Sequence, residues 1–175
     1  MNLKGATIHL KPITLNEVNN TYLSWLQDDE VMQGLATSGY TLENLKSYVS
    51  GRINKPGIAF FAIWSNDTNE HIGNIKLELQ DAAAKVSDIG LLIGNKNYWG
   101  KGVGMEACKL ALSYGFEEMA LRKIYLAVYE NNPVAKKIYE KLGFKLEGTL
   151  RKQVLVKGEY FDKYLMGLFK NEFIK

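Results

Sequence analysis

The chain has 175 residues, of which 46% are hydrophobic and 23% are charged. A chain of this length and composition folds as one domain with a sizeable core, which excludes a disordered protein, a collagen and a coiled coil. Its apolar stretches are shorter than the roughly 20 residues that span a bilayer, and its start lacks the apolar core of a signal peptide. We therefore expect one cytoplasmic domain over residues 1–175, without a membrane partner.

Cysteine, histidine and charge narrow the function further. The single cysteine, Cys108, cannot form an internal disulfide, and two histidines without a cysteine cluster predict no metal site. Residues 1–121 carry a net charge of −3 and residues 122–175 of +6. The later lysines are spread over helix and strand patterns, which argues against a nucleic-acid partner. A small polyanionic ligand or an unevenly charged surface explains the asymmetry.

The first half of the chain alternates between strand and helix patterns, read from apolar spacings of two or of three and four. In chain order, these patterns predict a strand over 6–13, a helix opened by the capping box from Thr14 to Glu17, a second helix capped by Thr41, a hairpin from 58–64 and 75–80, and a buried central strand over 88–94. Two helices are thus expected before the main sheet.

The second half alternates helices with strands. Its patterns predict a helix after a glycine-rich stretch at 99–104, a strand over 124–128, a helix from Asn132 to Gly143, and a closing hairpin that turns at Lys157 and Gly158. The sum is a single α/β (α+β) domain, in which helices flank a mixed, mostly antiparallel sheet.

The stretch Trp99-Gly100-Lys101-Gly102-Val103-Gly104 is the most informative segment. Closely spaced glycines let backbone amides point inward together, and the following helix adds free N–H groups and its positive dipole end. This geometry suits phosphate. The loop lacks the Ser or Thr of a Walker motif, and Met105 replaces the third glycine of a dinucleotide fingerprint. A phosphate site and a plain tight turn both remain possible interpretations.

A second motif follows the next predicted strand. It reads Asn132-x-x-Ala135-x-x-x-Tyr139-x-x-x-Gly143-Phe144. Together with the glycine-rich helix opening and the order of the elements, it resembles the GNAT superfamily of acetyl-CoA-dependent N-acetyltransferases. Residues 10–12, 22–26 and 147–162 resemble the branch that holds ribosomal-protein, spermidine and amino-sugar N-acetyltransferases. The resemblance implies an acyltransferase that uses acetyl-CoA as co-substrate.

The resemblance also assigns the glycine loop. The superfamily pattern is Gln/Arg-x-x-Gly-x-Gly/Ala, and Gly102 and Gly104 take its two small positions, while Trp99 replaces the basic or amide residue. Trp99 therefore cannot add a polar side-chain contact to phosphate. The amides of Gly100, Lys101, Gly102, Val103 and Gly104 would bind the pyrophosphate of coenzyme A.

The pantetheine arm of the cofactor is assigned in the same way. The resemblance implies that Leu92, Ile93 and Gly94 pair with the arm as a neighbouring strand would. It places Asn132 beside the arm, and a helix-capping role for Asn132 is compatible with that contact.

Acetyl transfer needs a proton for the departing thiolate and a base for the attacking amine. The resemblance makes Tyr139 the general acid, since a phenol has a basicity similar to that of a thiolate. Tyr139 also lies on an apolar helical stripe and could instead be a core residue. Glu78 and Asp88 are the candidate bases, for which exposed strand carboxylates are the alternative interpretation.

Three classes of primary-amine acceptor are open. An amino-sugar nucleotide comes first, because residues 22–31 resemble proteins of surface-polysaccharide pathways. A polyamine is second, since Asp28, Asp29, Glu30 and Glu43 could form an acidic site for a polycation. A protein N-terminus is third. The sequence also leaves open a homo-oligomer and a protein of another class, a non-catalytic acyl-CoA-binding module.

Overall fold

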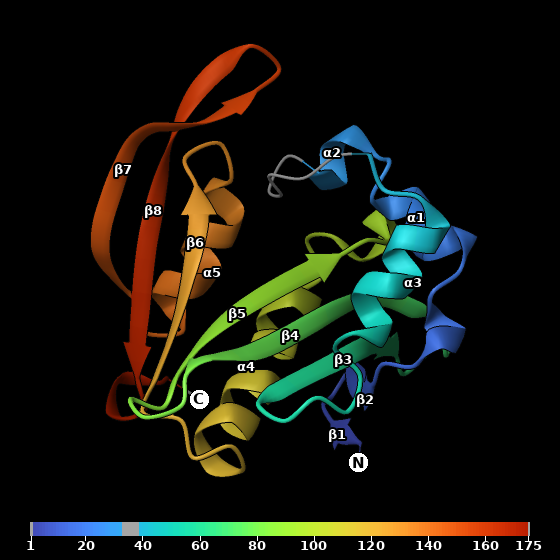
Figure 1. The fold of residues 1–175 in the computed structure, drawn as a ribbon, viewed down its shortest axis with the longest axis horizontal. Coiled ribbons are helices and arrows are strands. Elements are labelled where there is room, and N and C mark those ends of the chain that lie inside the picture. Colours follow the sequence, from blue (N-terminus) through green and yellow to red (C-terminus); the bar gives the residue numbers. More distant parts are fainter. Residues whose placement is uncertain (1, 33–38, 175) are drawn as a thin grey trace.

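The structure is a computed structural model that describes residues 2–32 and 39–174. Its elements, drawn in Figure 1, follow one another as β1 (Leu3–Lys4), β2 (Ile8–Pro12), the short helix η1 (Leu15–Glu17), α1 (Asn20–Trp25), α2 (Asp29–Met32), α3 (Leu42–Ser50), β3 (Ile58–Ser65), β4 (His71–Asp81), β5 (Val86–Ile93), the short helix η2 (Lys96–Tyr98), α4 (Val103–Glu117), β6 (Lys123–Tyr129), α5 (Pro133–Lys141), β7 (Lys145–Val156), β8 (Glu159–Phe169) and the short helix η3 (Lys170–Glu172). The strand β1 is an addition to the predicted elements.

All strands belong to one sheet, in the order β1-β2-β3-β4-β5-β6-β8-β7. Every pair of neighbours is antiparallel except β5 and β6, which run parallel. A parallel pair needs a crossover connection, and α4 provides it between these two strands. The predicted α/β (α+β) fold with a mixed, mostly antiparallel sheet is therefore confirmed.

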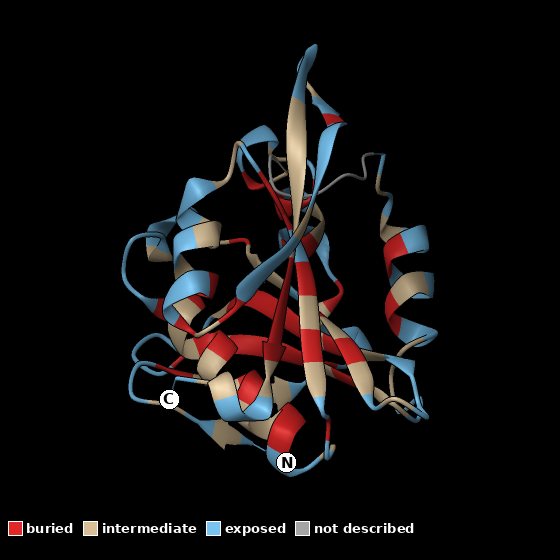
Figure 2. Cartoon of the chain, turned by 90° about the vertical axis from the view of Figure 1, so that its left-hand side faces the viewer, coloured by how far each residue is buried: buried red, intermediate tan, exposed pale blue. Residues whose placement is uncertain are grey.

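Helices cover both faces of the sheet, because side chains along a strand point alternately to the two faces. Phe61 and Ile63 of β3 belong to the core with α4 and α5, whereas Ala62 packs in a second core with α1 and α3. Figure 2 shows the buried residues where the helices meet the sheet, and a largely exposed outer part of the β7–β8 hairpin.

The first helical region differs from the prediction. The capping box of Thr14 and Glu17 forms, but it opens only the short helix η1. The side chain of Asn19 then accepts from two backbone N–H groups and starts α1, and that of Asp28 does the same ahead of α2. Each new cap restarts the helix in a new direction. Within residues 2–32 and 39–57, three α-helices therefore precede β3, and the expectation of two was wrong.

The strand expected to be buried over 88–94 is also different. β5 begins earlier, at Val86, and most of its residues are half-buried or exposed; only Ser87 and Ile89 are buried. A central strand is buried when neighbours and helices cover it on all sides. β5 lies centrally in the strand order, but part of one edge has no partner strand, as described below.

We predict that Gly94→Ala destabilises the fold. A Cβ at this position would lie 2.0 Å from the ring of Trp25, so the substitution must displace a buried tryptophan. Overpacking of this kind costs about 1–3 kcal/mol in the free energy of unfolding, measurable by denaturant titration. Gly90→Ala, in β5 shortly before Gly94, is the control, because a Cβ there meets no atom within 4 Å. Equal stability of both variants would refute this packing role.

Candidate active site

β5 and β6 separate shortly after they begin to pair. The register runs only from Val86 to Asp88, where Asp88 lies opposite Tyr125. Both strands continue, but they diverge in Figure 1. Within the described residues, the edge of β5 from Ile89 to Ile93 that faces β6 therefore has no partner strand. An extended ligand can add to such an edge through main-chain hydrogen bonds.

Main-chain groups alternate in direction along this open edge. Gly94 donates its N–H to the carbonyl of Ile72 in β4 at 3.0 Å, and in an antiparallel pair every second residue faces the partner. Leu92 therefore also faces β4, whereas the main-chain groups of Leu91 and Ile93 face the open side. Leu91 is absent from the residues expected to meet the pantetheine arm, although the two-residue period of a strand could have indicated it.

Trp99 connects this edge to the glycine loop. Its indole N–H donates to the carbonyl of Ile93 at 2.8 Å, while 42% of the residue stays exposed. The bond ties the start of the loop to the end of β5 and occupies one main-chain acceptor on the open side. The tryptophan that replaces the family's basic or amide residue is thus positioned to hold the loop in place.

The loop itself leaves its backbone accessible. Gly100 and Gly102 have φ values of +73° and +81°, which residues with a Cβ rarely adopt. An added Cβ at either position would meet no atom within 4 Å. Gly102 caps α4 without a side-chain hydrogen bond, and Glu106 donates to its carbonyl at 3.1 Å. The backbone N–H groups of residues 103–105, in the first turn of α4, have no acceptor within the helix and can therefore bind an anion.

The first turn of α4 brings three elements together. A Cβ at Gly104 would lie 3.5 Å from Leu91 of β5 and 3.8 Å from Ile138 of α5. Val103 is buried in the core, and the ammonium of Lys101 lies 5.5 Å from the ring centre of Tyr98. The loop, the open edge of β5 and the helix that carries Tyr139 therefore converge.

Asn132 caps the start of α5, and Tyr139 lies in the last turn of this helix. The side chain of Asn132 accepts from the N–H of Ala135 at 3.1 Å, as a helix cap does. Tyr139 is 8% exposed and its ring lies 5.6 Å from that of Phe144. Burial, with a contribution from Cys108, raises the pKa of Tyr139 far above its usual range. An ordinary phenol is already protonated at neutral pH, and the raised pKa makes the phenol of Tyr139 a weaker acid than a free tyrosine.

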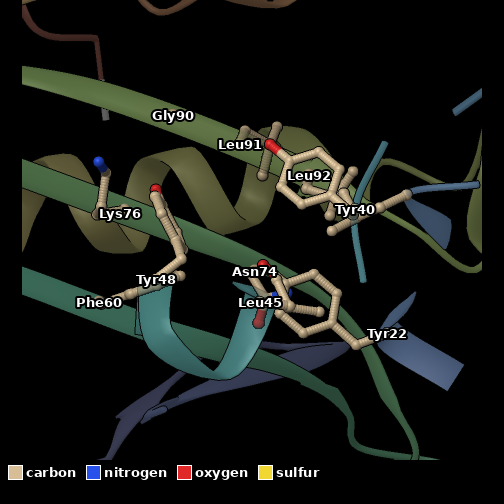
Figure 3. A pocket seen from close by; sticks show the side chains of 11 residues that line it. Tyr22, Tyr40, Leu45, Tyr48, Phe60, Asn74, Lys76, Gly90, Leu91 and Leu92 are labelled. Atoms are coloured by element: carbon tan, nitrogen blue, oxygen red, sulfur yellow. The ribbon is translucent and has the colours of Figure 1, made fainter. Parts of the chain in front are cut away.

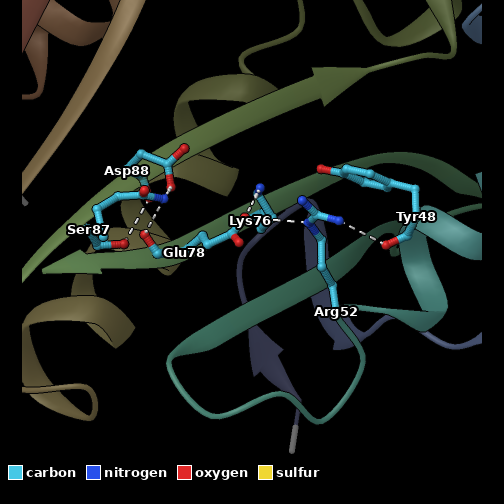
Figure 4. Close-up of polar contacts among 7 residues, drawn as sticks. Tyr48, Arg52, Lys76, Glu78, Ser87 and Asp88 are labelled. Atoms are coloured by element: carbon cyan, nitrogen blue, oxygen red, sulfur yellow. Dashed lines mark hydrogen bonds and ion pairs between the residues drawn. The ribbon is translucent and has the colours of Figure 1, made fainter. Parts of the chain in front are cut away.

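The two carboxylates proposed as bases face each other across β4 and β5. Glu78 is paired with Asp88 in the sheet register, and it forms ion pairs with Lys76 and, at 3.4 Å, with Arg52 (Figure 4). Burial favours the protonated, neutral form of Glu78, but Lys76 and Arg52 outweigh this effect and lower the pKa of Glu78. Asp88 accepts one hydrogen bond from Gln80 at 3.2 Å and is the less constrained carboxylate.

Tyr125 is a further polar residue at the point where the strands separate, and the sequence did not indicate it. It lies opposite Asp88 in the register. Burial, reinforced by the charge of Asp88, raises the pKa of Tyr125.

A pocket of about 140 Å³ lies on the α1 and α3 side of the sheet. Figure 3 shows Lys76 and Tyr48 side by side, with Tyr22 and Tyr40 farther along the pocket. It is lined by Tyr22, Leu26, Tyr40, Leu45, Tyr48, Phe60, Asn74, Lys76, Gly90, Leu91 and Leu92. Since residues 90–92 belong to the open part of β5, the pocket adjoins the edge where the arm would lie.

Asn74 gives this pocket an unused donor. The residue is 3% exposed, and its Oδ1 lies 3.0 Å from Nε2 of His71, yet its Nδ2 has no hydrogen-bond partner among the described residues. His71 packs against Trp25 and Trp64, and burial lowers the pKa of this histidine. A neutral His71 can donate to Asn74, which leaves the amide N–H for a ligand acceptor.

Three of the four carboxylates expected to serve a polyamine form ion pairs with lysines of the same chain, and the fourth, Glu43, is exposed on α3. Lys96 lies 2.7 Å from Asp28 and 2.6 Å from Glu30. Lys157, in the turn of the β7–β8 hairpin, lies 3.3 Å from Asp29. These carboxylates are outside the residues that line the pocket.

Comparison with known proteins identifies the family. The Acetyltransferase (GNAT) domain matches residues 7–145. The chain belongs to the GNAT family. A prophage-derived uncharacterised N-acetyltransferase of Bacillus subtilis is 31% identical over 83% of this chain and 82% of its own length. The resemblance seen in the sequence is therefore confirmed, and the GNAT chain described here is an acyltransferase.

Two further comparisons bear on fold and acceptor. A spermidine N(1)-acetyltransferase of Escherichia coli is 39% identical over 47% of this GNAT chain and 45% of its own length. The crystal structure of spermidine N-acetyltransferase from Vibrio cholerae in complex with CoA and spermine superposes with a TM-score of 0.87, at 22% identity, over 96% of this chain and 98% of that one. The superposition shows a shared fold.

Residues 2–32 and 39–174 contain neither a candidate membrane-spanning helix nor a candidate metal site. None of the helices there is both long and apolar enough to cross a membrane. His, Cys, Asp and Glu side chains in the same ranges form no group of three or more that could hold a metal ion.

We predict that Gly102→Val weakens binding of coenzyme A by roughly tenfold, because a branched side chain at a positive φ distorts the loop and blocks the approach of phosphate. Gly158→Val is the matched control: its φ is +86° and its surroundings are equally open, but it lies in the β7–β8 turn. Titration calorimetry measures affinity and thermal unfolding measures stability. An affinity that falls equally in both variants would contradict the loop assignment.

Proposed function

We propose that this GNAT enzyme transfers an acetyl group from acetyl-CoA to the primary amine of a small molecule, with an amino-sugar nucleotide as the first choice of acceptor. The observation that carries the proposal is the convergence at β5. The glycine loop follows its end, one edge is open, Gly104 lies near Ile138 of the helix that carries Tyr139, and the pocket adjoins residues 90–92.

The chemistry assigned to the residues follows this arrangement. Main-chain amides of the loop hold the pyrophosphate, and Leu91 and Ile93 orient the pantetheine arm along the open edge. The neutral amine in the pocket attacks the thioester carbonyl, forming the C–N bond, and the C–S bond then breaks. Tyr139 donates its proton to the departing thiolate, and Asp88 accepts the proton of the amine directly or through water.

Asp88 is preferred to Glu78 as the base because of their neighbours. Glu78 holds Lys76 and Arg52 in ion pairs, and its carboxylate is stabilised in the charged form. A carboxylate so stabilised is a weaker base. Asp88 lies where β5 and β6 separate and has a single hydrogen bond from Gln80 among the contacts of the described chain.

The aromatic walls support a ring-shaped acceptor. A pocket lined by tyrosines and Phe60 can stack against the apolar face of such a ring. The donor Nδ2 of Asn74 can serve a hydroxyl oxygen.

A polyamine is the second candidate acceptor. This candidate is supported by the similarity of the chain to two proteins that are described as spermidine N-acetyltransferases. The ion pairs of Asp28, Asp29 and Glu30 weigh against it in this chain. A thiol-release assay with acetyl-CoA and a panel of an amino-sugar nucleotide, spermidine and a short peptide tests the proposal. Release by none of these amines, with coenzyme A still bound, would favour a non-catalytic protein.

We predict that Tyr139→Phe lowers kcat by about a hundredfold, because the thiolate loses its proton donor. Coenzyme A affinity should be nearly unchanged, since the ring that packs against Phe144 is kept. Steady-state kinetics and calorimetry measure the two quantities. Tyr114→Phe is the control. It removes a phenol hydroxyl from α4 and keeps the ring, which packs against Phe61. Unchanged kcat in Tyr139→Phe would remove this residue from the acid role.

A further inference from the structure

The pocket carries one charge of its own. Among the described residues that line it, Lys76 alone is charged. Its side chain is 14% exposed and comes from β4, on the same face as Asn74 and Glu78. Figure 3 places its ammonium at one end of the pocket, beside Tyr48.

The neighbours of Lys76 keep it charged and in place. Glu78 pairs with Lys76 and also with Arg52, whose guanidinium lies 3.9 Å from the ring centre of Tyr48. Burial opposes the charge on Lys76, but Glu78, Tyr48 and Asp88 outweigh that effect and raise its pKa. Lys76, Arg52, Glu78 and Asp88, which lies across from Glu78, have a net charge of zero, and this becomes +1 when Asp88 takes up the proton of the attacking amine.

We propose that Lys76 is a specificity-determining residue: its ammonium admits acceptors with a single amino group on an uncharged or anionic body, and disfavours acceptors that carry a second cation. The inference rests on the proposed acetyl transfer to a small amine and narrows its acceptor class.

The physical reason is the fate of each positive charge in the pocket. The amine that reacts must lose its proton, so it adds no charge beside Lys76 when it attacks. A second ammonium of a polyamine keeps its proton, and it would lie within a pocket of about 140 Å³ that already holds a cation. Like charges at such separations repel strongly when they are partly removed from water.

The nearby carboxylates offer a second ammonium little compensation. Glu78 already pairs with Lys76 and Arg52, and Asp28, Asp29 and Glu30 pair with Lys96 and Lys157 outside the pocket. Glu43 is exposed on α3 and does not line the pocket. Tyr22 stays neutral because burial raises its pKa. An uncharged ring, or one bearing a phosphate or carboxylate, meets no such penalty.

The test compares two probes that differ by one charge. Pentylamine and putrescine have the same chain length, with a methyl group in the first where the second has an ammonium. We expect the wild type to favour pentylamine over putrescine in kcat/KM, measured by thiol release. Lys76→Met should reduce that preference at least about tenfold, which corresponds to about 1.4 kcal/mol. Lys76→Arg, which keeps the charge, should retain it.

A third variant extends the series in the other direction. Glu78→Gln leaves Lys76 and Arg52 unopposed and should increase the preference for pentylamine. Because the preference is a ratio of two amines on one variant, a general loss of activity cancels. A preference that does not change in Lys76→Met, or that changes equally in Lys76→Arg, overturns the inference.

Binding separates this inference from the proposed function. Calorimetric titration of putrescine into the protein with coenzyme A should show binding at least about tenfold tighter in Lys76→Met than in the wild type. Tighter binding without thiol release from any amine would refute acetyl transfer and retain the role of Lys76. Thiol release with equal putrescine affinity in both proteins would retain acetyl transfer and refute that role.

Discussion

The separation of β5 from β6 after Asp88 is the constraint on which the candidate site depends. A parallel pair normally continues until its strands end, and here β5 runs on without a partner on one side. The unpaired main-chain groups are costly when buried and useful when a ligand meets them. The same stretch of β5 is half-buried, approaches Gly104 through Leu91 and lines the pocket at residues 90–92.

The glycine loop depends on the same strand through Trp99. In the superfamily pattern, this position holds a basic or amide side chain, and here an indole N–H reaches the carbonyl of Ile93 instead. The chain thus exchanges a side chain suited to contact phosphate for one that fixes the backbone. Phosphate recognition then falls to main-chain amides and to the start of α4, which need a fixed geometry to act together.

Ion pairs between side chains determine which charges are available to an amine acceptor near the pocket. Acidic residues that look available in the sequence lie beside lysines that are distant along the chain, such as Lys96 for Asp28 and Lys157 for Asp29. Lys76, in contrast, comes from the second strand of the predicted hairpin and ends in an aromatic pocket. The same charged residues can favour or disfavour the binding of a polycation, because the outcome depends on which side chains pair with one another in the fold.

The sequence by itself determined the fold class, the order of most elements, the glycine loop and the family, because these depend on local spacing, on caps such as Asn132 and on turn residues such as Gly158. It could not determine that β5 loses its partner, that Leu91 faces the open edge, or that Tyr22, Tyr48, Asn74 and Lys76 share a pocket. These facts depend on register and on contacts between residues far apart in the chain, which only tertiary packing decides.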